Sequence, residues 1–298
     1  MRSEIDHLPA DRQRELAEIQ RILFDEFKDA LAGRNAPRLK AGRILKVILF
    51  GSYARGDWVA DPVGGYFSDF DILIVVNHEE LTDFVDFWAL ADDHLVREHM
   101  GTGRLQTPVN FIVHDLADLN RQLRRGRPFF RNIVRDGVIL YEAPGNPLNQ
   151  ATMLSEEEAR QEALLHFQEW FPSAVNFIEA GEFLRGKPAP KEAAFQFHQA
   201  TERLYHCVLL VLTLYSPKSH KLNFLRSQAE QLAPSLITAW PRDTRFAQRS
   251  FELLRRAYVE ARYSPHFRVN GEELQWLSEH VVILRDAVEE VCRVRLAE

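Results

Sequence analysis

The sequence predicts an α+β fold, in which a mixed sheet with helices is followed by an all-α, up-and-down helical bundle. Short apolar runs of strand length alternate with helical segments over residues 44–141. Residues 142–150, EAPGNPLNQ, contain two prolines and a glycine, a composition typical of a linker. From residue 155 onward the apolar residues recur at helical spacing only. We therefore expect two domains, residues 1–145 and residues 151–298.

The expected elements of the first half follow from the spacing of its apolar residues. Such residues recur every three or four positions over residues 8–32, which predicts an amphipathic helix. Residues 72–76 are entirely apolar, as in a strand that is covered on both faces. Residues 58–67 include a proline and two glycines and are expected to form a loop. The other elements expected here are strands over 44–50, 109–113 and 137–141, and helices over 81–100 and 116–125.

The second half is expected to be a bundle, because five helical segments are separated by short breaks rich in proline, glycine and serine. The breaks are Gly-Lys-Pro, Ser-Pro-Lys, a proline-containing turn at 234–242, and Ser-Pro-His. The segments expected to be helical are 155–182, 191–215, 219–232, 244–263 and 271–296.

Composition excludes several classes of protein. A hydrophobic content of 46% in 298 residues is enough for a sizeable core. The net charge of −6 lacks the overall basic excess expected of a protein that binds duplex nucleic acid mainly through its phosphates. Two cysteines do not make a disulfide framework or a zinc site. The N-terminal residues lack the apolar stretch of a signal peptide, and the longest apolar run is far shorter than the ~20 residues of a membrane span. We expect a cytoplasmic protein without a membrane partner.

The most informative segment is LFGSYARGDWVADPVGGYFSDFDILIVVN, from Leu49 to Asn77. Gly51 follows an apolar strand and precedes an expected helix, and a glycine there allows a phosphate to approach the backbone. The free N–H groups at a helix start favour phosphate oxygens, and Ser52 adds a hydroxyl donor. Since many turns contain Gly-Ser, this pair alone is weak evidence for phosphate binding.

Asp69 and Asp71 strengthen the interpretation. Residues two apart in a strand point to the same face, so both carboxylates are expected to project together at the start of an apolar strand. Mg²⁺ favours sites with one or two carboxylates, substrate phosphates and water. The alternative is a solvated strand entry in which aspartate is a turn former. With Gly-Ser on the neighbouring strand, the metal site is favoured.

The motifs GSYARGD and SDFDILIVV resemble the signature of the DNA polymerase β nucleotidyltransferase superfamily, in its minimal, kanamycin-nucleotidyltransferase-like branch. The resemblance covers residues 40–141. It implies a nucleotidyltransferase fold in which Gly51 and Ser52 hold a triphosphate, ATP or another NTP, while Asp69 and Asp71 ligate Mg²⁺. Members of that family carry a third acidic residue on the next strand.

The position of that third acidic residue is occupied by Asn110, which we include among the candidate catalytic residues. An asparagine can ligate a metal through its carbonyl oxygen but cannot accept a proton at neutral pH. Asp115, just beyond the strand, is a candidate substitute. Nucleotide binding is therefore a safer expectation than turnover.

An arginine-rich stretch, residues 121–135, follows the third expected strand and contains two adjacent phenylalanines. Guanidinium groups match phosphates well, so the stretch could meet a nucleotide or RNA, with Arg124 and Arg127 as the best candidates. A solvated helix face with two core phenylalanines is the interpretation that we favour.

The second half resembles the HEPN domain, a helical bundle found fused to minimal nucleotidyltransferases, over residues 155–296. The resemblance implies pairing of bundles into a homodimer, and RNA cleavage where an arginine is followed, four to six residues later, by a histidine. Arg262 and His266 are the nearest match, with only three residues between them. The alternative is that Arg262 pairs with a carboxylate and His266 caps a turn. His198 and Glu202 are four residues apart and are expected to share a helix face. They could form an acid–base or metal-binding pair, but such a pair is more often a polar contact inside the bundle.

Three functions remain open from the sequence. The first is Mg²⁺-dependent transfer of a nucleoside monophosphate from an NTP to a hydroxyl of a small molecule, such as an aminoglycoside, or of a protein. The second is a toxin–antitoxin system, in which the HEPN half cleaves or binds RNA and the first domain regulates it. The third is nucleotide binding without turnover, which Asn110 favours.

Overall fold

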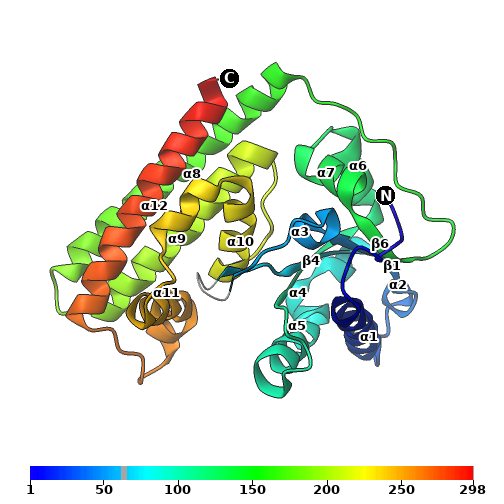
Figure 1. The fold of residues 1–298 in the computed structure, drawn as a ribbon, viewed down its shortest axis with the longest axis horizontal. Coiled ribbons are helices and arrows are strands. Elements are labelled where there is room, and N and C mark those ends of the chain that lie inside the picture. The colour runs from blue at the N-terminus through cyan, green and yellow to red at the C-terminus, as the bar shows by residue number, and fades with distance from the viewer. Residues whose placement is uncertain (62–65, 298) are drawn as a thin grey trace. The chain divides into compact units, whose positions relative to one another are not determined.

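The computed structural model describes residues 1–61 and 66–297. The chain divides into two compact units, one made of residues 1–61 and 67–154 and the other beginning at Ser155. The first unit combines a sheet with helices, and the second is helical (Figure 1). The predicted α+β fold class is confirmed.

A four-stranded mixed sheet organises the first unit, with strand order β5-β4-β1-β6. β1 pairs antiparallel with β4 and with β6, whereas β4 and β5 are parallel. Parallel neighbours require a crossover connection, which the helices between β4 and β5 supply. The strands are β1 (Ile44–Phe50), β4 (Phe70–Val76), β5 (Val109–Asp115) and β6 (Val138–Glu142). Two short strands, β2 (Ala60–Asp61) and β3 (Tyr66–Phe67), pair separately.

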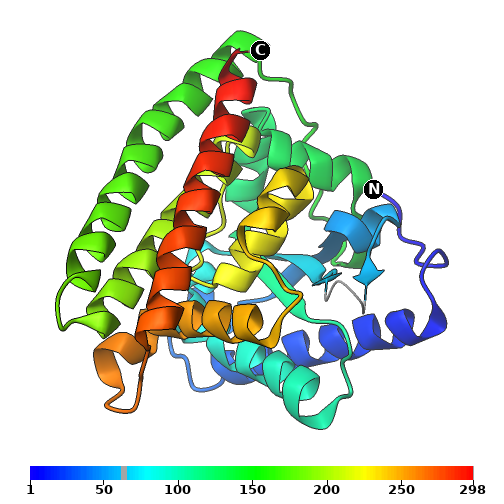
Figure 2. The same cartoon turned by 60° about the vertical axis from the view of Figure 1, so that its left-hand side comes forward.

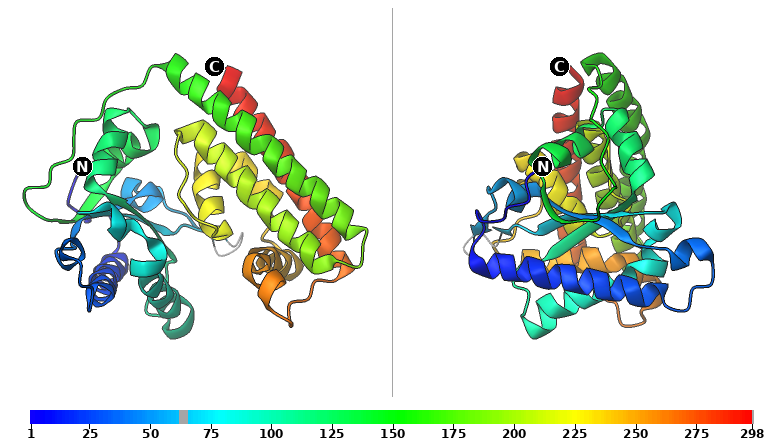
Figure 3. Two further views of the ribbon diagram at one scale, coloured as in Figure 1. Left: turned by 180° about the vertical axis from the view of Figure 1, so that it is seen from behind. Right: turned by 90° about the vertical axis from the view of Figure 1, so that its right-hand side faces the viewer.

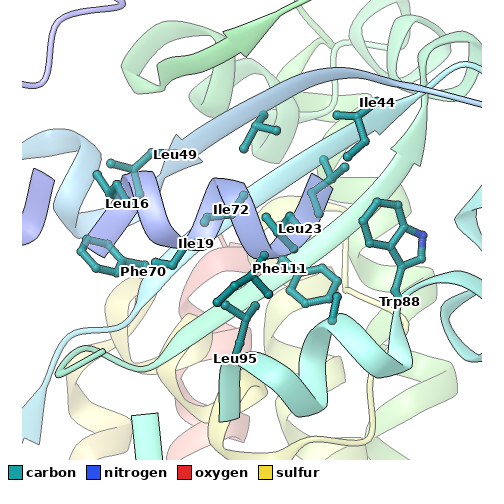
Figure 4. Packing of buried hydrophobic residues seen from close by; sticks show 14 of the residues in the cluster. Leu16, Ile19, Leu23, Ile44, Leu49, Phe70, Ile72, Trp88, Leu95 and Phe111 are labelled. Carbon is teal, nitrogen blue, oxygen red and sulfur yellow. The ribbon is translucent and has the colours of Figure 1, made fainter. Parts of the chain in front are cut away.

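Helices cover both faces of this sheet (Figures 1 and 2). On one face, apolar side chains of α1 pack against alternate residues of β4 and against Trp88 and Phe111, forming a buried core (Figure 4). The opposite face carries Asp71 at the strand entry and is covered by α6 and α7. The helices of this unit other than those between β4 and β5 are α1 (Ala10–Leu31), α2 (Pro37–Lys40), α3 (Gly51–Arg55), α6 (Leu116–Arg124) and α7 (Pro128–Asp136).

The segment expected to be helical, residues 81–100, is helical for most of its length but is divided into short helices. The Asp83 side chain accepts the N–H of Asp86 at 2.9 Å and starts a new helix. Trp88 then leaves helical geometry, with φ −127°, while its indole N–H donates to the carbonyl of Leu81 at 2.7 Å. Burial of this large side chain therefore interrupts the helix. The segment consists of η1 (Glu79–Thr82), α4 (Phe84–Phe87), α5 (Ala89–Arg97) and η2 (Glu98–Thr102).

The expected loop over residues 58–67 is also only partly correct. β2 and β3 occupy its described ends, and residues 62–65 lie outside the described residues. The backbone of Ser68 donates to the carbonyl of Val59 at 2.8 Å, and the Ser68 hydroxyl accepts the N–H of Val59 at 2.9 Å. The segment thus contains paired backbone next to the entry of β4.

The second unit is a bundle in which α9 is the central helix (Figure 3). It contacts α8, α10, α11 and α12, and most of its side chains are buried. The five expected helices are present, with ends shifted by a few residues, and a short 3₁₀ helix occupies the expected proline-containing turn. They are α8 (Glu156–Arg185), α9 (Pro190–Thr213), α10 (Leu222–Leu232), η3 (Pro234–Ala239), α11 (Arg245–Tyr263) and α12 (Gly271–Ala297). Within the described residues, no helix combines the length and apolar character needed to cross a membrane.

Candidate nucleotide and metal site

The Gly-Ser turn and the acidic strand entry are in direct contact. β1 ends at Phe50, whose register partner on β4 is Asp71. The next residue, Gly51, has φ +72°, a conformation that side-chain-bearing residues rarely adopt. A Cβ atom at this position would lie 2.4 Å from Oδ2 of Asp71. Both the backbone and the space therefore require glycine here, and the closeness that the sequence led us to expect is present.

Asp69 and Asn110 complete the polar group at this end of the sheet. Asp71 faces Asn110 in the parallel pairing of β4 with β5. The amide of Asn110 donates a hydrogen bond to Oδ2 of Asp69 at 2.9 Å. Asp71 is fully buried, whereas Asp69 is half-buried. The two carboxylates and the amide thus gather beside the Gly-Ser turn, and their functional roles remain predictions.

Ser52 is buried within α3, and its hydroxyl has no hydrogen-bond partner among the described residues. A buried hydroxyl without a hydrogen-bond partner is energetically costly. An oxygen atom of a bound ligand that accepted the hydrogen of this hydroxyl would remove that cost. α3 has only five residues, and so few aligned peptides carry a small macrodipole. A phosphate bound at this turn would therefore depend on the N–H groups of the turn and on the Ser52 hydroxyl, and not on the macrodipole of a long helix.

Asp115 does not belong to this group, and the prediction that it substitutes for a third carboxylate is wrong. It pairs with Val76 at the other end of β5, five residues or ~17 Å along the strand from Asn110. Its carboxylate accepts the N–H of Asp118 at 2.9 Å and caps α6. No group of three or more His, Cys, Asp or Glu among residues 1–61 and 66–297 has metal-binding geometry. A metal at the acidic pair would take its other ligands from phosphates and water, as Mg²⁺ does.

The arginine-rich stretch forms the end of α6 and most of α7, which packs beside α3. The ring of Phe129 meets that of Phe50 with centroids 5.7 Å apart, and Phe130 is fully buried. Arg121 forms an ion pair with Asp118. These contacts agree with a helix that packs Phe130 in the core, while Phe129 is partly buried against Phe50.

In the helical unit, Arg262 and His266 are both exposed. The Nε of Arg262 donates to the carbonyl of Tyr258 at 2.8 Å, and its guanidinium lies 4.7 Å from the centroid of that ring. The interactions that the structure gives the two side chains do not join one to the other. The expected pairing of Arg262 with a carboxylate is likewise replaced by an aromatic contact. RNA cleavage by this pair remains a prediction.

Glu202 is the centre of a second polar group, the Glu202 cluster, formed with three histidines. Its Oε1 lies 2.9 Å from Nδ1 of His220, and its Oε2 lies 3.4 Å from Nε2 of His198. Nε2 of His206 is 3.9 Å from Oε1. Burial raises the pKa of Glu202, but hydrogen bonds from His198 and His220 outweigh it, so the pKa lies below the ordinary value. This contact could not be predicted from the sequence, because His220 follows Glu202 by 18 residues and shares no helical spacing with it.

The predicted polar contact between His198 and Glu202 is therefore present, within a larger group. Nδ1 of His198 must donate its hydrogen to the carbonyl of Leu254, 2.9 Å away.

We predict that His206 makes the helical unit less stable in acid. Burial is the main reason that its pKa falls to about 4, from 6.5 in an exposed histidine. Between pH 6.5 and pH 4, His206 is therefore protonated in the unfolded chain but neutral in the folded unit. The free energy of unfolding falls as the pH falls through this window, by at most about 3 kcal/mol. Denaturant unfolding of wild type and His206→Gln at pH 7, 6, 5 and 4 measures the effect.

The expected result is a shallower loss of stability in His206→Gln than in wild type. His266→Gln is the matched control, because this histidine is exposed. Equal acid-induced losses in wild type and His206→Gln would contradict the assignment of this pH dependence to His206.

Parts of the sequence are similar to two domain families and to a curated protein. Residues 35–99 match the nucleotidyltransferase domain family, and residues 167–292 match the HEPN domain family. A curated protein of Methanocaldococcus jannaschii, named "Putative protein adenylyltransferase MJ0604", is 35% identical over 116 residues. That match covers 39% of this chain and 92% of the relative. The two domain families are those that the sequence motifs resemble.

Proposed function

Because this chain belongs to the nucleotidyltransferase family and joins that domain to a HEPN domain, we propose that it moves a nucleoside monophosphate from a nucleoside triphosphate to an acceptor hydroxyl. The observation that carries the proposal is the contact between Gly51 and Asp71, where a Cβ atom would meet the carboxylate at 2.4 Å. A turn whose N–H groups can donate to phosphate oxygens thus lies next to carboxylates that can hold a divalent cation.

Each residue of the site has a proposed role that follows from its chemistry. Gly51 leaves the backbone open to the phosphates, and Ser52 donates its otherwise unpaired hydroxyl to a phosphate oxygen. Asp69 and Asp71 hold Mg²⁺, which when bound neutralises charge on the transferring phosphate. The fit is supported by the two adjacent carboxylates and by the absence of a side chain at Gly51, which lets the Asp71 carboxylate lie against the turn.

Asn110 is a positioning residue in this proposal. Its amide donates to Asp69 at 2.9 Å and so fixes the orientation of that carboxylate. Since an amide cannot take the proton of an acceptor hydroxyl, residue 110 is not a general base. This observation also favours a second candidate function, a nucleotide sensor that binds an NTP without transferring it.

For the acceptor, we favour a side-chain hydroxyl of a protein and ATP as the donor. The named activity of the M. jannaschii relative, protein adenylyltransfer, supports this choice, and the match covers nearly the whole of that protein. An aminoglycoside hydroxyl is the small-molecule alternative. Both acceptors present an alcohol oxygen that displaces pyrophosphate from the α-phosphate.

The test is to incubate the full chain with Mg²⁺, cell extract and ATP labelled at either the α- or the γ-phosphate. Transfer predicts that label from the α-position, but not from the γ-position, becomes attached to protein. Label in a small-molecule fraction would identify the alternative acceptor. Tight ATP binding with no transfer from the α-position would favour the sensor, and the absence of ATP binding would reject both functions.

A further inference from the structure

The carboxyl end of α3 is held by side chains from the first residues of the chain. A five-residue helix cannot satisfy its last carbonyl groups internally and is not stable by itself. The carbonyl of Ser52 accepts the N–H groups of Gly56 and Asp57, at 2.8 and 3.1 Å. The two carbonyls that follow, those of Tyr53 and Ala54, therefore need partners from elsewhere in the unit.

Those partners are His7 and Arg2. Nε2 of His7 lies 2.9 Å from the carbonyl oxygen of Tyr53 and must donate its hydrogen there, because a carbonyl only accepts. The guanidinium of Arg2 donates to the carbonyl of Ala54 and also lies 3.3 Å from the His7 ring. A cation at the carboxyl end of a helix adds a favourable charge interaction to the hydrogen bond.

The segment that carries these side chains, residues 2–8, is itself anchored at both ends, and we call it the N-terminal clasp. The carbonyl of Arg2 accepts the N–H of Ile139, a residue of β6, at 2.8 Å. At the other end, Leu8 is buried in the core, and the Gln13 side chain donates to its carbonyl at 2.9 Å. The clasp therefore links α3 to an edge of the sheet and to α1.

We infer that Arg2 and His7 are positioning residues for the phosphate-binding turn. α3 begins with Gly51 and Ser52, so a clasp that fixes its last turn also fixes the N–H groups and the hydroxyl at its start. Arg2 and His7 bond to the carboxyl end of α3, and their effect on a nucleotide is transmitted through the backbone of this helix. The inference rests on the proposed function, because it assigns ATP to this turn.

The experiment compares Arg2→Ala, Arg2→Lys and His7→Ala with wild type, using calorimetric titration of Mg·ATP and hydrogen exchange of backbone amides 52–57. Arg2→Ala and His7→Ala are expected to weaken ATP binding about tenfold and to speed amide exchange in α3. Arg2→Lys, which keeps a cationic donor, is expected to recover most of the affinity. Arg14→Ala, which removes an exposed arginine of α1, is the matched control and should change neither quantity.

The outcomes separate the two proposals. ATP affinity in Arg2→Ala and His7→Ala equal to that of wild type would overturn the role of the clasp and leave the proposed function standing. Wild-type protein that binds no ATP would overturn the proposed function, and the clasp inference with it. Weaker binding in Arg2→Ala without recovery in Arg2→Lys, and with unchanged amide exchange, would also count against the clasp.

Discussion

Replacing Asp69 and Asp71 together with alanine is expected to abolish transfer of the nucleoside monophosphate and to weaken Mg·ATP binding at least a hundredfold, which is ~3 kcal/mol. The two carboxylates are the proposed metal ligands, and removing both leaves the phosphates without a neutralising cation beside the turn. The chain should still fold, because two neighbouring carboxylates repel each other in the free protein and their loss relieves that repulsion. Calorimetric titration of Mg·ATP and the α-labelled transfer assay measure the two effects.

The control for this variant must remove the same charge elsewhere. Asp25 and Asp29 are exposed on α1, and their double replacement by alanine should leave ATP binding and transfer unchanged. Circular dichroism of both double variants tests whether the fold is kept. Wild-type ATP affinity in a folded Asp69→Ala, Asp71→Ala chain would reject the assignment of the acidic pair to the metal.

The sequence carried enough information to predict the main elements of the fold, because burial imposes a local pattern on them. β4 is covered on both faces, and its residues 72–76 form an unbroken apolar run, while α1 shows the spacing of a helix with one buried face. The break of the helix at Trp88 could not be predicted in this way. It depends on a buried indole and its bond to Leu81, a tertiary preference that overrides the local pattern.

The same distinction applies to the candidate site. Asp69 and Asp71 were found because residues two apart share a strand face, and Gly51 because glycine marks a turn. Asp115 cannot replace Asn110, because five residues of extended strand separate the two and place Asp115 at the opposite end of β5. The roles of Arg2 and His220 depend likewise on contacts between distant segments, for which the sequence has no periodic signal.

Gly51→Ala is expected to abolish Mg·ATP binding and to lower the free energy of unfolding of the first unit by about 2–4 kcal/mol. Two causes add. The backbone at Gly51 has φ +72°, which costs an alanine about 1–2 kcal/mol. Its Cβ would also lie 2.4 Å from Oδ2 of Asp71, so the carboxylate or the turn must move. Denaturant unfolding and calorimetric titration measure the two consequences.

Gly33→Ala separates these causes, because Gly33 has φ +80° but no atom within 4 Å of the place that an alanine methyl group would take. It should show the backbone cost alone and bind Mg·ATP normally. The combined variant Gly51→Ala, Asp71→Ala removes the collision. Its loss of unfolding free energy should therefore be smaller than the sum of the losses in the two single variants, while ATP binding stays absent. Equal stability losses in Gly51→Ala and Gly33→Ala would contradict the close approach of the turn to Asp71. The site would then lose the contact that joins its phosphate-binding and metal-binding parts.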